Sequence, residues 1–326
     1  MTAVPQNETV TAVVSRAGGS LDDPNSLVDA RIPAPGAPTG HDLLVEVQAV
    51  SVNPVDVKVR ASGNRGDKDR ILGWDASGTV VAVGEDVTLF RPGDEVFYAG
   101  AIERSGSYSA RRIVGPKPSS LTHAQAAALP LTGITAWEAL FDKLGLTQNA
   151  SGTLLVLGGA GGVGSILIQL AKELTSATVI ATASRSESRE WALSLGADAV
   201  VDHSSDDLAH QILAVAPGGV DWVFTPQSKG RIPLFTEIVR PFGEIVAIDD
   251  ERDLDLFALK GKAISWHWEL MFTRPRFGYD LEAQHRALAS ISELVDAGRI
   301  RTTMTKMLGP IGAEALREAH QILETG

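Results

Sequence analysis

Residues 153–174 read TLLVLGGAGGVGSILIQLAKEL, an apolar run followed by a glycine-rich turn and a second apolar run with helical spacing. ATVIATA follows at 177–183 and is typical of another strand. The order of strand, turn, helix and strand predicts a βαβ unit. Strand-like runs DAVVD, VDWVF and GEIVAID come later in the chain, separated by stretches long enough for helices. This alternation predicts an α/β fold with a doubly wound parallel sheet.

The turn contains G-x-G-x-x-G at Gly159, Gly161 and Gly164, with Gly162 and Val163 between the last two glycines. Glycines at these positions allow a tight turn, close approach of a pyrophosphate to the backbone, and close packing of the helix on the strand. The motif in this setting therefore predicts a dinucleotide site. The alternative is a glycine-rich connection in a protein that binds no nucleotide.

The end of the second strand carries Ser184 and Arg185 where an NAD site would place Asp or Glu, about 20 residues beyond the motif. A hydroxyl and a guanidinium suit a 2′-phosphate, whereas a carboxylate would repel it. We therefore expect NADPH as cofactor. The alternative is that Arg185 and Arg189 only solvate a loop and the start of a helix.

The sequence before this unit has a different texture. Segments 9–18, 43–52, 78–84 and 94–100 are β-rich and are broken by Pro and Gly, which predicts an antiparallel, barrel-like lobe up to about residue 120. A helical connector is expected over 123–146. Near the C-terminus, 280–297 has the pattern of an amphipathic helix, with Gly298 where a helix-ending glycine belongs.

Composition narrows the possible functions. The 326 residues are 44% hydrophobic and carry a formal net charge of -11, without a basic stripe that could hold nucleic acid. The N-terminus does not resemble a signal peptide, and no stretch approaches eighteen uninterrupted apolar residues, so we expect a cytoplasmic protein with no membrane contact. The absence of cysteine excludes disulfides, thiolate catalysis and every zinc site built with Cys.

The motifs SVNPVDVKVR, ILGWDASGTVVAVG, RPGDEVFYAG, AALPLTGITAWEAL and LGGAGGVGSILIQLAK occur in this order. Together they resemble the medium-chain dehydrogenase/reductase superfamily, in particular its quinone oxidoreductase branch and the zinc-free members called zinc-type alcohol dehydrogenase-like. The resemblance implies a GroES-like catalytic domain made from residues 1–126 and 271–326, with a Rossmann NADPH-binding domain at 127–270 between them. It also implies a homodimer formed through an edge of the nucleotide-domain sheet, and GEIVAID is a β-rich segment near a possible edge.

The resemblance places the ligands of the catalytic zinc of alcohol dehydrogenases at Asn53, at Trp74 and near Leu131 or Thr132. An amide, an indole and an aliphatic or hydroxyl side chain cannot replace Cys, His and Cys. We therefore expect no metal at this site.

Without a metal, hydrogen-bond donors must polarise the oxygen of a hydride acceptor. The resemblance puts Asn53 beside the nicotinamide, where its amide N–H can donate, and makes Lys58 a candidate proton donor or electrostatic stabiliser. Asp56 could orient Lys58 or a substrate group, and His267 could donate a proton. The alternatives are a solvated strand residue for Lys58, a turn-capping acceptor for Asp56 and a structural role for His267.

Aromatic side chains are the candidates for an apolar substrate wall, namely Trp74, Trp268 and Phe272, although such residues are also common in ordinary cores. Thr132 is expected to approach the nicotinamide carboxamide or ribose. The resulting hypothesis is an NADPH-dependent oxidoreductase that transfers hydride to a small quinone, enone or carbonyl compound without zinc. The alternatives are an NADPH-binding structural or sensory protein with little turnover, and an alkenal or enoyl reductase.

Overall fold

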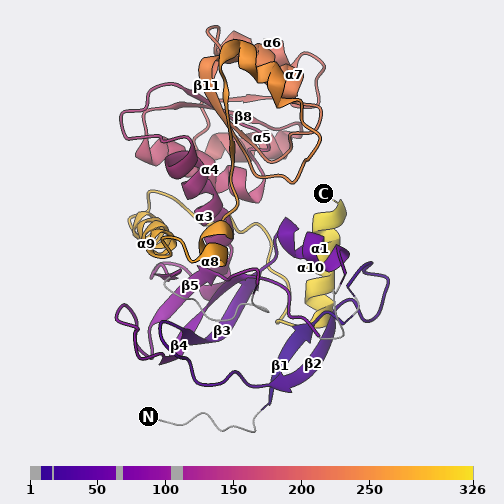
Figure 1. Cartoon of the computed structure of the whole chain (residues 1–326), viewed down its shortest axis with the longest axis vertical. Helices are drawn as coiled ribbons and strands as arrows, with labels where there is room; N and C mark the ends of the chain where they lie inside the picture. The colour runs from indigo at the N-terminus through magenta and orange to yellow at the C-terminus, as the bar shows by residue number, and fades with distance from the viewer. Residues whose placement is uncertain (1–8, 17, 64–68, 104–112, 326) are drawn as a thin grey trace. The chain divides into compact units, whose positions relative to one another are not determined.

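The structure is a computed structural model that describes residues 9–16, 18–63, 69–103 and 113–325. The chain divides into two compact units, one made of residues 1–131 and 272–326 and the other of residues 132–271. The first unit is therefore built from both ends of the chain, and the second is inserted within it (Figure 1).

The inserted unit contains a six-stranded parallel sheet with the strand order β12-β11-β10-β7-β8-β9. Its strands are β7 (Thr153–Val156), β8 (Thr178–Thr182), β9 (Ala199–Val201), β10 (Val220–Thr225), β11 (Val239–Ala247) and β12 (Ser265–Trp268). The order reverses between β7 and β10, because β8 and β9 continue to one side of β7 while β10 to β12 continue to the other. The doubly wound parallel sheet predicted from the sequence is confirmed, and its switch point lies at the carboxyl end of β7, where such folds bind ligands.

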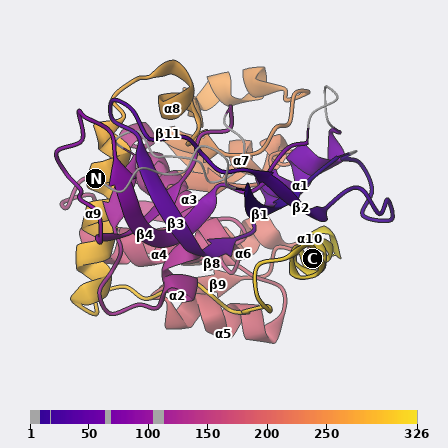
Figure 2. The same cartoon turned by 90° about the horizontal axis from the view of Figure 1, so that it is seen from below.

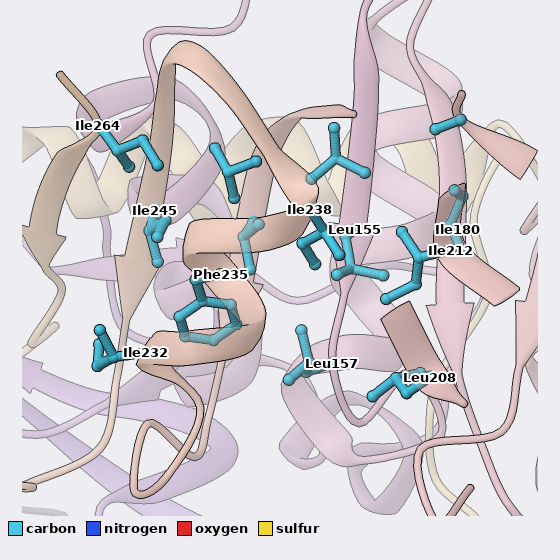
Figure 3. Close-up of a cluster of buried hydrophobic side chains, with 14 of the residues drawn as sticks. Leu155, Leu157, Ile180, Leu208, Ile212, Ile232, Phe235, Ile238, Ile245 and Ile264 are labelled. Carbon is cyan, nitrogen blue, oxygen red and sulfur yellow. The ribbon is translucent and has the colours of Figure 1, made fainter. Parts of the chain in front are cut away.

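Helices accompany these strands. They are α3 (Pro130–Trp137), the π-helix η1 (Glu138–Lys143), α4 (Gly162–Leu174), α5 (Ser186–Ser194), α6 (Leu208–Val215), α7 (Ile232–Ile238) and the 3₁₀-helix η2 (Leu256–Lys262). Buried apolar side chains from β7, β8 and β11 face those of α6 and α7, as Figure 3 shows for Leu155, Ile180, Ile245, Ile212 and Phe235. Leu154 and Val179, which point to the opposite face of β7 and β8, are buried as well, and burial on both faces explains why the strands read as continuous apolar runs.

The unit built from both chain ends is antiparallel. One sheet has the order β3-β4-β5-β6, and a second sheet pairs β1 with β2. Its strands are β1 (Thr9–Val14), β2 (Val28–Pro33), β3 (Leu43–Ser51), β4 (Asp75–Val83), β5 (Glu95–Ala99) and β6 (Val114–Pro116). Its helices are α1 (Pro54–Ala61), α2 (His123–Ala127), α8 (Thr273–Phe277), α9 (Glu282–Asp296) and α10 (Ala313–Thr325).

The C-terminal segment completes this unit by packing on its sheet. A Cβ at Gly115 would lie 2.5 Å from the Cβ of Leu288, so the glycine in β6 lets α9 approach closely. The Nδ1 atom of His285 in α9 lies 2.6 Å from the carbonyl oxygen of Val114. The predicted helix is confirmed, and Gly298 follows it with a φ of 69°, the left-handed conformation that ends helices.

Two local expectations are corrected. The segment that carries Lys58 is a helix, not a strand, because Pro54 occupies the first turn and Asp56 caps it. GEIVAID lies within and just after β11, which is paired on both sides, and the strands at the edges of the sheet are β12 and β9.

Helices in the described part of the chain are all too short or too polar to cross a lipid bilayer.

Candidate functional site

The glycine-rich turn joins β7 to α4, as the motif predicts. A Cβ at Gly164 would lie 2.3 Å from the carbonyl oxygen of Gly158, and a Cβ at Gly159 would lie 2.7 Å from the Cβ of Ala181. Real Cβ atoms do not approach so closely, so both positions require glycine. The helix therefore starts directly against the strand, and the turn stays bare of side chains.

The open side of this turn is the N-terminus of a 13-residue helix. Gly161 is the N-cap residue of α4, and both Gly161 and Gly162 are exposed while Val163 is half-buried. The first N–H groups of a helix have no intrahelical acceptor and carry a partial positive charge. This cradle fits the pyrophosphate of a dinucleotide.

Two features of the turn lie outside the predicted motif. Gly158 has a φ of 66°, so the glycine before the motif is also needed for backbone conformation. Thr182, at the end of β8, accepts a hydrogen bond at Oγ1 from the N–H of Gly158 (3.0 Å) and at its carbonyl from the N–H of Gly159 (3.1 Å). The sequence signal that could have indicated this role was Thr182 itself, a residue with a β-branched, hydroxyl-bearing side chain at the end of the strand.

The two arginines that follow β8, Arg185 and Arg189, have different surroundings in the structure. Ser184 and Arg185 are exposed, and Arg185 is the N-cap residue of α5. Arg189 instead donates hydrogen bonds to the carbonyl oxygens of Val200 (2.9 Å) and Ala183 (3.4 Å). Arg189 thus ties α5 to the adjacent strands, whereas Arg185 is presented to solvent.

Thr132 lies beside the same turn. It is 6% exposed, and a Cβ at Gly162 would lie 3.2 Å from its Cγ2 atom. The structure therefore brings together Thr132 and the predicted glycines, all within the inserted unit.

In the other unit, Asn53 is the N-cap residue of α1 and is held by two carboxyl groups. Its side-chain amide donates to Oδ2 of Asp75 (2.7 Å), and its backbone N–H donates to Oδ2 of Asp56 (2.6 Å). Asp75 also accepts the backbone N–H of Leu131 at Oδ1 (2.7 Å). Sequence reasoning missed Asp75, although a carboxylate in the apolar stretch ILGWDASG was a visible signal.

Both carboxyl groups are buried and have perturbed acidity. Burial raises the pKa of Asp75 to about 7, although hydrogen bonds from Asn53, Leu131 and Ser51 oppose the shift. Burial raises the pKa of Asp56 to about 8, with the Asn53 N–H opposing the shift and the nearby Asp75 adding to it. Asp56 is therefore mostly protonated at pH 7.

The remaining polar candidates have different surroundings. Lys58 is exposed on α1, two residues beyond Asp56, and residues at that spacing project from different sides of a helix. His267 lies on β12 in the inserted unit, half-buried, with its Nε2 atom 2.9 Å from Oε2 of Glu244 on β11. Glu244 thus gives His267 a structural partner across the strand pair.

The aromatic candidates for the substrate wall differ in their exposure. Trp74 and Phe272 are 0% and 2% exposed, and their rings meet edge to face at 5.6 Å. The indole N–H of Trp74 donates to the carbonyl oxygen of Ala101 (3.1 Å). Trp268 is 46% exposed and packs its ring 5.5 Å from that of Trp266.

The positions that would hold a catalytic zinc do not fit the metal. Asn53 already binds Asp75, Trp74 is buried with its only donor engaged, and Leu131 and Thr132 offer no imidazole or thiolate. In the part of the chain that the structure describes, no cluster of three or more His, Cys, Asp or Glu side chains has a metal-binding arrangement.

A second buried carboxyl group was also missed. Glu269, just after β12, is 5% exposed, and burial raises its pKa to about 9, with Glu138 of η1 adding to the shift. The Lys143 ammonium lies 4.0 Å from its Oε2 and opposes the shift. No sequence motif pointed to these residues, because they meet only through packing of η1 against the segment after β12.

Together, the inserted parallel sheet with its glycine turn and the antiparallel unit define a Rossmann-type nucleotide-binding domain combined with a GroES-like domain. Residues 39–136 match the family model described as alcohol dehydrogenase GroES-like domain, and residues 162–265 match the one described as zinc-binding dehydrogenase.

Known proteins of this class are similar along most of the chain. A zinc-type alcohol dehydrogenase-like protein of Staphylococcus epidermidis is 39% identical, with 96% of each chain covered. A mitochondrial NAD(P)H oxidoreductase of Homo sapiens is 33% identical over 80% of this chain and 74% of its own. The crystal structure of a candidate zinc-dependent alcohol dehydrogenase from Rhizobium etli CFN 42 superposes with a TM-score of 0.93 at 48% identity, covering 98% of this chain and 96% of that one.

The chain belongs to the medium-chain dehydrogenase/reductase superfamily, among its zinc-type alcohol dehydrogenase-like proteins, and is an oxidoreductase of that class. The resemblance drawn from the sequence motifs is confirmed.

Proposed function

We propose that the protein binds NADPH and transfers its hydride to a small quinone, enone or carbonyl compound without the help of zinc. The observation that carries this proposal is the bare glycine cradle at the start of α4, combined with a β8 tip that presents Ser184 and Arg185 in place of a carboxylate.

The cofactor supplies the hydride, and the residues of the inserted unit bind and orient it. The N–H groups of Gly161, Gly162 and Val163 are the donors available to the pyrophosphate. Ser184 and Arg185 are the proposed partners of the 2′-phosphate, a doubly charged group that needs donors. Thr132, packed against Gly162, is the proposed neighbour of the nicotinamide carboxamide or ribose.

Asn53 is the proposed donor to the acceptor oxygen. One of its two amide hydrogens is held by Asp75, which fixes the plane of the amide and leaves the second hydrogen for a ligand. Removing a comparable donor in other enzymes slows the chemical step by about 10²–10³-fold. Lys58 and His267 are the proposed proton donors, and Asp56 supports Asn53 through the backbone N–H.

The substrate class is proposed from the aromatic residues. Trp74 and Phe272 form a buried edge-to-face pair in the unit built from both chain ends. Trp268 is the exposed member of the set and the one that can offer a ring face to a planar acceptor.

The test is NADPH oxidation by the purified protein with separate panels of quinones, enones and aldehydes, followed by the loss of NADPH absorbance. Turnover of one panel identifies the substrate class. Reduction of the carbon–carbon double bond of an enone identifies an alkenal or enoyl reductase. Tight NADPH binding with no turnover on any panel would support the alternative of a nucleotide-binding sensor and would contradict the proposal.

A pair of variants tests the role of Asn53. Asn53→Ala should lower kcat by about 10²-fold and leave NADPH affinity unchanged. Asn149→Ala, in an exposed turn, is the matched control and should keep full activity. Equal kcat values for the two variants would remove Asn53 from the chemistry.

A further inference from the structure

A cavity of about 1170 Å³ lies within the unit built from both chain ends, and all of its described lining residues belong to that unit. We call it the β-unit cavity. The residues that line it belong mainly to β1, β2, β3 and the segment 34–39, and Leu316 and His320 of α10 also contribute. Figures 1 and 2 show these strands and this helix in the fold. Most of these wall side chains are aliphatic, among them Val13, Leu27, Ile32, Val45 and Val47. A space of this size and character fits an apolar small molecule.

One polar atom in the wall lacks a partner. Asp56 lines the cavity and is 1% exposed, and its Oδ1 atom has no hydrogen-bond partner, while Oδ2 accepts the N–H of Asn53. Buried polar groups are nearly always satisfied, and an unsatisfied one costs free energy. Because burial raises the pKa of this carboxyl group and keeps it protonated at neutral pH, it offers a hydrogen to a ligand that can accept one.

A second neutral donor lines the same cavity. His320 of α10 accepts a hydrogen bond at Nδ1 from Nε of Arg60 (3.1 Å). A guanidinium cannot accept, so the imidazole proton must be on Nε2. Burial, with the charge of Arg60, lowers the pKa of His320 to about 4, so this imidazole is neutral at pH 7.

The charges of the wall exclude one class of ligand. Among the described residues that line the cavity, the charged side chains are carboxylic acids, including Asp29, Asp42 and Glu46, and no Lys or Arg is present. A fatty-acid carboxylate or a phosphate would find no cation here and would be repelled by the acids. The two buried donors, Asp56 and His320, call for an acceptor oxygen instead.

We infer that the β-unit cavity binds an uncharged, mostly apolar small molecule with a carbonyl oxygen that accepts a hydrogen bond from the Asp56 carboxyl group. The inference does not depend on NADPH binding, because the cavity and both donors belong to the unit that lacks the glycine turn.

The test is calorimetric titration of the full chain, free of NADPH, at pH 7. The probes are the ketone 2-nonanone, its anionic relative nonanoate and its cationic relative nonylamine. We expect saturable binding of the ketone and at least about ten-fold weaker binding of nonanoate, because the wall offers acidic side chains and no cation to its carboxylate. Nonylamine can pair with the wall acids, so it tests whether those acids or the Asp56 donor select the ligand. Nonanoate binding as tight as that of the ketone, or nonylamine binding tighter than that of the ketone, would overturn the assigned chemistry.

Two pairs of variants locate the ligand. Ala12→Phe fills part of the cavity and should weaken the ketone by at least about ten-fold, whereas Ala61→Phe, exposed at the end of α1, should not. Asp56→Leu removes the donor and should weaken binding about three- to ten-fold. Asp56→Asn keeps both a donor and an acceptor for Asn53 and should bind as the parent does.

The result that overturns the inference is the absence of saturable ketone binding, or binding that Ala12→Phe leaves unchanged. Circular dichroism of each variant separates loss of the fold from loss of the site. The variant Ser184→Asp/Arg185→Ala, altered in the inserted unit, should bind the ketone as the parent does. If the cavity does not bind the ketone, the proposal that the inserted unit binds NADPH therefore still stands. If the protein does not bind NADPH, the cavity inference still stands.

Discussion

The choice of cofactor should depend on the side chains at the tip of β8. In the variant Ser184→Asp/Arg185→Ala, a donor becomes a carboxylate and the exposed guanidinium at the start of α5 is lost. We expect NADPH to bind much more weakly and NADH to bind nearly as before, since only NADPH carries the 2′-phosphate.

The expected loss of NADPH affinity follows from the hydrogen bond that Arg185 would make to the 2′-phosphate. A hydrogen bond to a charged group contributes about 1.5–3 kcal/mol, which corresponds to about a ten- to hundred-fold change in Kd for Arg185→Ala alone. The carboxylate that replaces the Ser184 hydroxyl repels the phosphate, so the double variant should lose more. Salt screens exposed charges over about 8 Å at physiological ionic strength, so the effect should shrink as salt is added.

The assay is fluorescence titration of NADPH and NADH at one fixed ionic strength. Arg189→Ala is the matched control, because Arg189 donates to the carbonyl oxygens of Ala183 and Val200. That variant should lower stability and keep the ratio of the two affinities. The reasoning is refuted if the parent binds NADH as tightly as NADPH, or if the double variant keeps its preference.

Three further outcomes are expected. Metal analysis should find no stoichiometric zinc and chelators should leave activity intact, because the chain has no cysteine and Trp74, where the family resemblance places a zinc-ligating His, has its indole N–H bound to Ala101. One tightly bound zinc per chain, lost together with activity, would contradict this. Light scattering at micromolar concentration should give a homodimer paired through the edge strand β12, weakened by Trp268→Glu, and a monomeric parent would rule this out. Urea denaturation should show stability falling as pH rises from about 5 to 7, by about 1.4 kcal/mol per pH unit for each of Asp56 and Asp75, because the folded chain still holds protons that the unfolded chain has released at these pH values. Asp56→Asn should remove one such contribution, and an unchanged slope would show that Asp56 titrates normally.

The sequence was sufficient for the elements whose causes are local. The run from Thr153 to Leu174 specifies strand, turn and helix through its apolar spacing and glycines, and the structure has each of them. The helix before Gly298 was predictable for the same reason, since periodicity and a C-terminal glycine act over a few residues. The absence of cysteine, which removes the usual zinc ligands, is also a property of the sequence alone.

Only the tertiary structure decided which residues meet across long separations. Asp75 reaches Asn53 from 22 positions away and Leu131 from 56, and Arg60 meets His320 across 260. The same packing distinguishes Arg185, left in solvent, from Arg189, bound to two carbonyl groups. Side-chain type and local spacing determine secondary structure, but the burial that raises the pKa of Asp56 and the cavity that it lines arise only when distant strands and helices pack together.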